Sequence, residues 1–565
     1  MPSLLILLLI FGMTCVGLGW PVAAKLELAP VEKIVTAVFL SVLGVFLASW
    51  LVYTAHLPGA VLWGLPVLAL AAFWFSRHSL LAALRDGEVR RLLGWQLMIV
   101  VWCLGWLALI FSYSGGAWAA DWVEHWERAR FFVERLPRDF LFIGSYGFTA
   151  RPPLVNAVAG AFLEISRNDF PHYQMLMAVF SCLAFLPAVL LARRFGSGRG
   201  LVGRVALLFM LNPLFLQNVT FVWTKLPTAF FVLLALWFFL HAWDRPPSKT
   251  TAALFAAALA AGILAHYSAG PYVVVLAAAW LWRAATRDGS WRGPTLVAAG
   301  VGGALLALWF GWAVAIYGKE TFLSNSSVIQ SHTYQGSQLG KIALNIYDTL
   351  VPHFLRSPDW MIVEQTNPWG KWRDWWFMLY QVNLFFALGS TAWLVALVTL
   401  WRDWRNTEAS RRRFWLGFVA ATVVLGIAVH GARDTWGLAH ICLQPLVLLG
   451  LAYLAARWTG LNVRWKRVLV AGATLDLLLG IFLHYAVQNL ALDRWFSAER
   501  SMASWFLGYS APVLMNIRSK LYNELRFFSD ALAMPPLAIF LLLGLLLALA
   551  MTLVVRDSRR NAEKA

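Results

Sequence analysis

A segment that begins at Asp121 gathers ionisable side chains on one face of a predicted helix. It reads DWVEHWERARFFVERL, and three- and four-residue steps along a helix align Asp121, Glu124, His125, Arg128 and Arg135. The opposite stripe is apolar and comprises Trp122, Trp126, Ala129, Val133 and Leu136. We expect this helix to rest its apolar stripe in a membrane interface and to hold its ionisable groups at the membrane surface. The alternative is a solvated amphipathic helix whose charges form ordinary salt bridges.

A cation follows this helix in a stiff stretch of backbone. After a Gly-Ser-Tyr-Gly turn the chain reads Ala150-Arg151-Pro152-Pro153-Leu154. The two prolines restrict the backbone and favour the start of a new helix. An arginine fixed in this way is suited to hold a phosphate.

Four further polar residues lie near the ends of apolar runs. They are Lys225, His266, Tyr267 and Arg433. A polar group within an apolar span costs a few kcal/mol unless it is paired, so such groups are enriched in functional sites. The alternative for each is a helix cap or a side chain that snorkels to the interface. We include all four in the candidate site.

The elements that position these residues are membrane helices. The chain has 565 residues, of which 60% are hydrophobic and 13% charged, and its mean hydropathy is +0.66. That is more apolar surface than a water-soluble fold can bury, so the solvent is lipid and the fold is all-α. We count roughly fifteen apolar runs of spanning length. The formal net charge of +18 comes mainly from arginines in short linkers, which indicates membrane topology and no nucleic-acid partner.

The basic linkers predict the orientation of these helices. Clusters lie at 77–91, 193–204, 283–292, 402–413, 457–467 and 556–564, and the positive-inside rule places all six in the cytoplasm. This rule is satisfied by membrane spans near 3–22, 33–54, 58–76, 93–112, 172–193, 201–217, 226–243, 251–266, 269–283, 295–316, 376–400, 414–430, 436–456, 468–486 and 536–555. The run 152–165 is then interfacial or re-entrant, and segments 112–171, 317–375 and 487–535 are external.

The order of features between roughly Trp95 and Gly196 resembles the family 39 glycosyltransferases of the GT-C superfamily, which include protein O-mannosyltransferases and lipid A aminoarabinose transferases. In that family a membrane helix leads into an external loop that opens with an acidic residue. A juxtamembrane helix follows, and then a basic residue before Pro-Pro-Leu. Here these features are the helix ending near Ser112, Asp121, the helix through Leu136, and Arg151 to Leu154.

The resemblance implies a GT-C-type bundle of about fifteen membrane helices, with juxtamembrane helices on its external face. Residues 1–92 would be an N-terminal three-helix extension, and residues 93–565 the catalytic domain. It also implies transfer of a sugar, with inversion, from a polyprenyl phosphate to an acceptor on the external side. The acceptor is open between a protein, lipid A, another glycan and a polyprenyl lipid.

The resemblance assigns roles to individual residues. Asp121 is the candidate general base, because a carboxylate can take the proton of an attacking hydroxyl. Arg151 would bind the donor phosphate, whose charge grows as it leaves. From their positions near the external ends of apolar runs, Arg433 and Lys225 are expected to assist it. The supporting polar groups, by their place on the charged helix face or at those ends, would be Glu124, His125, Arg128, His266 and Tyr267.

One departure leaves the use of a divalent cation open. Many members of the family carry a second acid directly after the first, and here that position is Trp122. The nearest substitutes are Glu124 and Glu127. No other cofactor is implied, and no metal ligands are assigned. The high content of Ala, Leu, Arg and Trp favours a bacterial source and hence an inner membrane. The orientation given by the basic linkers places the active site on the outer side. The competing function class is a multi-pass transporter or lipid flippase, for which charges near the membrane midplane and inverted repeats are expected.

Overall fold

The computed structural model describes residues 2–110, 121–144, 146–198, 200–244, 247–287, 289–322, 337–352, 355, 368–428, 443–483 and 526–562. These described residues form helices joined by short connections and contain no strand. Phe142 and Tyr146 form an isolated antiparallel bridge. The all-helical prediction is therefore confirmed for the part of the chain that the structure describes.

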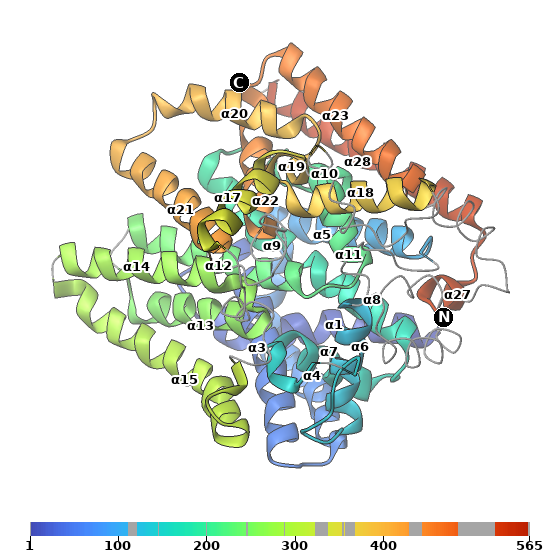
Figure 1. The fold of residues 1–565 in the computed structure, drawn as a ribbon, viewed down its shortest axis with the longest axis vertical. Coiled ribbons are helices and arrows are strands. Elements are labelled where there is room, and N and C mark those ends of the chain that lie inside the picture. Colours follow the sequence, from blue (N-terminus) through green and yellow to red (C-terminus); the bar gives the residue numbers. More distant parts are fainter. Residues whose placement is uncertain are drawn as a thin grey trace.

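The first helices open the bundle, and most of them lie in the lower half of Figure 1. They are α1 (Pro2–Gly17), α2 (Trp20–Ala23), α3 (Pro30–Thr54), α4 (Gly64–Arg85) and α5 (Gly87–Leu107), with a 3₁₀ turn at Gly59–Trp63 between α3 and α4. Asp86 starts α5, since its carboxylate accepts hydrogen bonds from two backbone N–H groups. Helices α1 and α3 pack against the later helices α8 and α7, so the N-terminal segment shares the core of the protein.

The middle of the chain carries the short helices around the candidate site. They are α6 (Asp121–Glu134), α7 (Leu154–Ile165), α8 (Phe170–Cys182), α9 (Phe185–Phe195), α10 (Leu201–Leu211) and α11 (Pro213–Thr220). The longer α12 (Lys225–Asp244), α13 (Lys249–Ala265), α14 (Gly270–Thr286) and α15 (Arg292–Tyr317) follow. Helix α13 packs between α12 and α15, and these green helices lie to the left in Figure 1.

The remaining helices correct one prediction. They are α17 (Gln338–Leu350), α18 (Pro368–Val382), α19 (Leu384–Leu388), α20 (Ala392–Trp404), α21 (Ala409–Ala428), α22 (Leu443–Arg457), α23 (Val463–Ile481), α27 (Phe528–Leu532) and α28 (Pro536–Ala562). The single span predicted at 376–400 was wrong, because α18, α19 and α20 divide it. Asn383 caps the start of α19, and Gly389 ends it at a φ of +125°, a conformation that favours glycine.

Several helices are long and apolar enough to cross a membrane. Seven of the described helical segments meet this description, or eight when the bent pair α10 and α11 counts as one span. These two helices meet at an angle of 68°, because Pro213 cannot continue the hydrogen bonding of α10. The protein is thus a helical membrane protein with multiple spans. The count of about fifteen stays a prediction from hydropathy.

Helix α7 fixes the place of the candidate site within this bundle. Its 12 residues reach about 18 Å, which is too short to span a bilayer. It packs along α6, and Gly160 permits the close approach. A Cβ at Gly160 would lie 2.9 Å from the carbonyl oxygen of Ala129. Arg151 lies just before α7, beside the first turn of α6.

Candidate active site

Residues 122–129 of helix α6 are buried on both faces of the helix. Trp122 lies 5.2 Å from Phe170, and Trp126 lies 5.2 Å from Tyr173, measured between ring centroids. The apolar stripe therefore packs against protein, which corrects the expectation that it rests in the membrane interface. The charged face is also enclosed, because the side chain of Glu124 is fully buried. The site consequently sits inside the protein.

Arg151 is the centre of the charged cluster. Its Nη2 lies 3.6 Å from Asp121 Oδ1 and 3.3 Å from Glu124 Oε2. Its Nε donates to Glu124 Oε1 at 3.4 Å, and its Nη1 lies 3.5 Å from His266 Nε2. One guanidinium thus bonds to α6 and lies beside the turn between α13 and α14.

Arg128 holds Glu124 in place from the other side. Its Nε donates to Glu124 Oε1 at 2.8 Å. Its two Nη groups donate to the backbone carbonyls of Phe148 and Gly147 at 3.0 and 3.1 Å. Its guanidinium also lies 4.1 Å from the centre of the Phe142 ring. These contacts tie the loop that precedes Arg151 to α6 and fix the approach of Arg151 to the carboxylates.

The two carboxylates of the first turn of α6 have opposite pKa shifts. Burial raises the pKa of Glu124, but Arg151 and Arg128 outweigh burial and bring this pKa down to about 2. At Asp121 burial also raises the pKa and is only partly offset by Arg151, while the charge of Glu124 raises the pKa further. Asp121 therefore has the higher affinity for a proton. Carboxylates separated in this way often divide structural and acid–base roles.

Trp223 and Lys225 complete the surroundings of Asp121. The indole Nε1–H of Trp223 donates to Asp121 Oδ2 at 3.1 Å, and the Lys225 ammonium lies 4.0 Å from the centre of the Trp223 ring. Val222 precedes them with a φ of +58°. A β-branched residue rarely adopts this backbone conformation, and it lets the short connection between α11 and α12 turn toward the site.

The tautomer of His266 follows from its local hydrogen bond. Its Nδ1 accepts the backbone N–H of Ser268 at 3.0 Å, so a neutral ring carries its proton on Nε2. That Nε2–H and the Nη1–H of Arg151 are both donors, and these two nitrogen atoms lie 3.5 Å apart. An acceptor oxygen placed beside both nitrogens would receive two hydrogen bonds. This pair is therefore suited to an anion.

His125 and Tyr267 have different places. Burial, with the nearby arginines, lowers the pKa of His125 to about 3, although Glu124 raises it. His125 is therefore neutral at pH 7. The hydroxyl of Tyr267 donates to the carbonyl of Thr149 at 3.0 Å and so braces the backbone before Arg151.

Most of the sequence-predicted residues meet in this cluster. The structure brings together Asp121, Glu124, His125, Arg128, Arg151, Lys225, His266 and Tyr267. Arg135 does not belong to it, since α6 ends at Glu134 and Arg135 is exposed with a φ of +54°. Glu127 turns away from Arg151 and accepts the backbone N–H of Ile143. Of the two candidate substitutes, Glu124 is thus the acid next to Asp121. Arg433, which was also predicted to belong to the site, lies outside the described residues.

Sequence reasoning missed two features. Trp223 bonds to Asp121 across the fold, and no local spacing connects the two residues. A second buried polar group surrounds Asp476, which accepts hydrogen bonds from the Tyr380 hydroxyl at 3.0 Å and the Ser390 backbone N–H at 2.9 Å. Asp476 lies in the predicted span 468–486, and the rarity of carboxylates in apolar spans could have drawn attention to it.

The donor set for a divalent cation is incomplete in the part of the chain that the structure describes. Within it, no group of three or more His, Cys, Asp or Glu side chains is arranged to hold a metal ion, and both carboxylates near Arg151 face cations. We derive no chemical step through a metal. Comparison of the chain with protein-family models, curated proteins and solved structures found no match.

Proposed function

We propose that this protein is a membrane glycosyltransferase that moves a sugar from a polyprenyl phosphate to an acceptor hydroxyl on the external side. The observation that carries the proposal is the pair Asp121 and Glu124, one turn apart beside Arg151, with opposite pKa shifts. The order of features from Asp121 to Leu154 supports the donor class, through its resemblance to family 39 enzymes.

In the proposed reaction Asp121 accepts the proton of the acceptor hydroxyl while the oxygen of that hydroxyl attacks the anomeric carbon of the donor sugar. The new C–O bond forms as the bond from that carbon to the phosphate oxygen breaks. A single displacement of this kind inverts the anomeric configuration. The raised pKa of Asp121 suits this role, because a more basic carboxylate is a better proton acceptor.

The leaving phosphate takes the bonding electron pair and gains negative charge. Arg151 Nη1 and His266 Nε2–H offer two donors to one oxygen, and donors fixed in a buried site stabilise such charge without reorganisation. Glu124 and Arg128 hold Arg151 in place. Lys225 brings its Nζ over the ring of Trp223, the residue that donates to Asp121.

Native mass spectrometry of retained lipids tests the proposal. We expect purified Asp121→Asn protein to retain a polyprenyl phosphate that carries a sugar, because binding persists while turnover is lost. The matched control is Asp139→Asn, an exposed aspartate after the same helix, which should turn over its donor like the wild type. Adding Arg151→Gln to Asp121→Asn should release the lipid. Retention of ordinary phospholipids only, in well-folded protein, would contradict the donor class.

A transporter or flippase is the second candidate, and the surroundings of Asp476 favour it. Asp476 is 4% exposed and lines a small cavity with Pro213, next to the bend between α10 and α11. Broken helices beside an intramembrane acid are common in transporters. Liposomes with a fluorescent phosphatidylglycerol would show accelerated flipping that Asp476→Asn abolishes if this candidate is correct. An unchanged flipping rate with the wild-type protein would reject it.

A further inference from the structure

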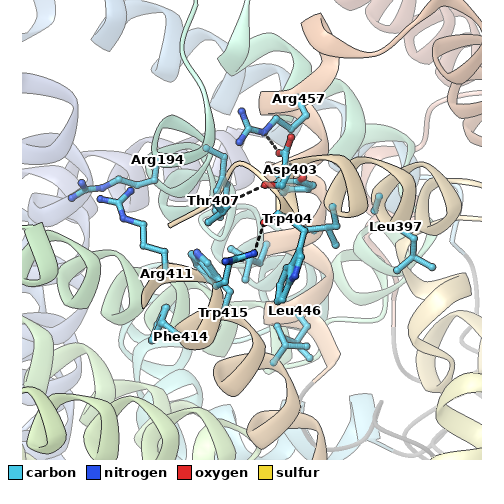
Figure 2. Close-up of a pocket in the computed structure, with 18 of the residues that line it drawn as sticks. Arg194, Leu397, Asp403, Trp404, Thr407, Arg411, Phe414, Trp415, Leu446 and Arg457 are labelled. Atoms are coloured by element: carbon cyan, nitrogen blue, oxygen red, sulfur yellow. Dashed lines mark hydrogen bonds and ion pairs between the residues drawn. The ribbon is translucent and has the colours of Figure 1, made fainter. Parts of the chain in front are cut away.

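A large pocket lies apart from the Asp121 site. It has a volume of about 800 Å³ and is lined by residues of α9, α12, α19, α20, α21 and α22. None of the residues around Arg151 lines it. Its volume falls within the range of sites for small organic ligands, and Figure 2 shows the side chains that surround it.

The wall of this pocket has an apolar part and a basic part. Leu397, Phe414, Trp415 and Leu446 belong to the apolar part. The basic part contains five arginines, Arg193, Arg194, Arg411, Arg412 and Arg457, and the lining includes two carboxylates, Asp403 and Glu408. Arg193 also pairs with Glu88, outside the lining, at 3.0 Å, so five positive charges face three negative charges and leave an excess of two. A ligand that fits both parts is an amphiphile with an anionic head.

Each of the two carboxylates already lies beside an arginine of the same lining. Asp403 is engaged by Arg457, at 2.6 Å, and by the hydroxyl of Tyr453, at 2.8 Å. Glu408 lies 4.0 Å from Arg411, and both side chains are more than half exposed, so this pair is weak. In Figure 2 Arg194 and Arg411 extend toward the same end of the pocket, away from Asp403 and Arg457.

Arg412 is held against Trp404, which also lines the pocket. Its Nη1 donates to the carbonyl of Trp404 at 3.2 Å, and its guanidinium lies 5.8 Å from the centre of the Trp404 ring. Among the residues that the structure describes, this is the one side-chain hydrogen bond of Arg412, so most of the five N–H donors of its guanidinium have no acceptor there. Arginine clusters of this kind bind phosphate oxygens through several donors at once.

The pocket also joins three basic linkers that are far apart in the sequence. Its arginines come from the clusters 193–204, 402–413 and 457–467, which the positive-inside rule places on the cytoplasmic side. An anionic lipid of the cytoplasmic leaflet would present its head group to these arginines. Its acyl chain would lie along Leu397, Phe414 and Leu446.

We propose that this pocket binds a phosphate-bearing lipid of the cytoplasmic leaflet. The phosphate contacts Arg194, Arg411 and Arg412, and the hydrocarbon chain fills the apolar part of the pocket. This binding site is separate from the Asp121 site and does not depend on the transfer reaction. Nucleotides and inorganic phosphate fit less well, because they leave the apolar wall unfilled.

Binding of dioctanoyl phosphatidic acid to the full-length protein in detergent, followed by native mass spectrometry, tests this site. We expect the variant Arg194→Gln/Arg411→Gln to bind at least about tenfold more weakly than the wild type, since each lost charge-assisted hydrogen bond weakens the grip on the phosphate. The matched control is Arg464→Gln/Arg467→Gln. Arg464 and Arg467 are exposed, belong to a basic linker of the same predicted side and do not line the pocket. The control should bind like the wild type.

Two competing ligands show whether the pocket needs both the phosphate and the hydrocarbon chain. Dioctanoylglycerol, which lacks the phosphate, should bind at least about tenfold more weakly than the phosphatidic acid. Inorganic phosphate in excess should not displace the lipid. Leu446→Trp, which fills the apolar part, should weaken lipid binding while circular dichroism shows that the fold is kept. Equal losses in the pocket and control variants, equal binding of the uncharged lipid, or displacement by phosphate alone would overturn the proposal.

Discussion

The substitutions Glu124→Gln and Glu134→Gln compare the loss of a buried ion pair with the loss of an exposed ion pair on the same helix. Glu124 and Arg128 are fully buried, with side chains 0% and 1% exposed, whereas Glu134 and Arg130 are 30% and 34% exposed. Both pairs have the same four-residue spacing, and each has an Nε to Oε1 distance of 2.8 Å. The two pairs differ mainly in their access to water.

Loss of the charge of Glu124 leaves two buried guanidinium groups without their shared carboxylate. Such a loss destabilises a protein by about 3–5 kcal/mol. The pKa of Glu124 gives a similar figure: its fall from 4.5 to about 2 corresponds to about 3 kcal/mol. Because the folded-state pKa is lowered, this contribution is present above pH 4.5 and is lost as the pH falls toward 2. Glu134→Gln should cost less than about 1 kcal/mol.

The assay is equilibrium unfolding of both variants in mixed micelles with increasing dodecyl sulfate, followed by circular dichroism at pH 7. We expect Glu124→Gln to lower the free energy of unfolding several times more than Glu134→Gln does. Equal losses in the two variants would refute the reasoning, because the buried position would then confer no additional stability. A loss near zero for Glu124→Gln would refute it as well.

Four further substitutions, at three residues, probe the site. Arg151→Lys should keep the fold but raise the KM for the donor by about tenfold or more, because an ammonium group cannot reach both carboxylates and a phosphate as a guanidinium does. Steady-state kinetics measure the KM. An unchanged KM would exclude the phosphate role of Arg151. His266→Asn retains an acceptor for the Ser268 N–H, so it should keep the stability of the protein while losing activity. His266→Gln should lose about 1 kcal/mol of stability and keep more activity than His266→Asn. The reverse ranking would contradict the assigned tautomer. The proposed base acts when deprotonated, so kcat/KM should rise with pH through the raised pKa of Asp121. Trp223→Phe removes a hydrogen bond that lowers this pKa and should shift the rise in kcat/KM to higher pH. A shift to lower pH would contradict the assignment.

The sequence alone predicted the residues of the site better than their surroundings. Asp121, Glu124 and Arg128 share a face because helical spacing is a local property, and the prolines after Arg151 mark the start of α7. The burial of the opposite face depends on Phe170 and Tyr173 of α8, whose positions follow only from tertiary packing. An amphipathic pattern alone does not distinguish a membrane interface from a protein core.

Hydropathy was likewise informative about the presence of helices and poor on their continuity. The run 376–400 is mostly apolar, and its breaks depend on Asn383 and on the φ of +125° at Gly389. The bend between α10 and α11 follows from Pro213, which the sequence displays openly, but its angle depends on contacts with distant helices. Asn212 illustrates this point, because its side-chain amide donates to the carbonyl of Ala387 in α19.

The packing of α3 on α7 has a practical consequence for shortening the protein. The hydroxyl of Ser49 donates to the carbonyl of Ala157 at 2.8 Å, and Phe11 lies 5.0 Å from Phe162 between ring centroids. A truncated version that begins at residue 93 would expose this side of α7, the helix that follows Arg151. Affinity tags and fusion partners are therefore better joined ahead of an intact first helix than used to replace it, and any minimal version of this protein must retain the N-terminal helices.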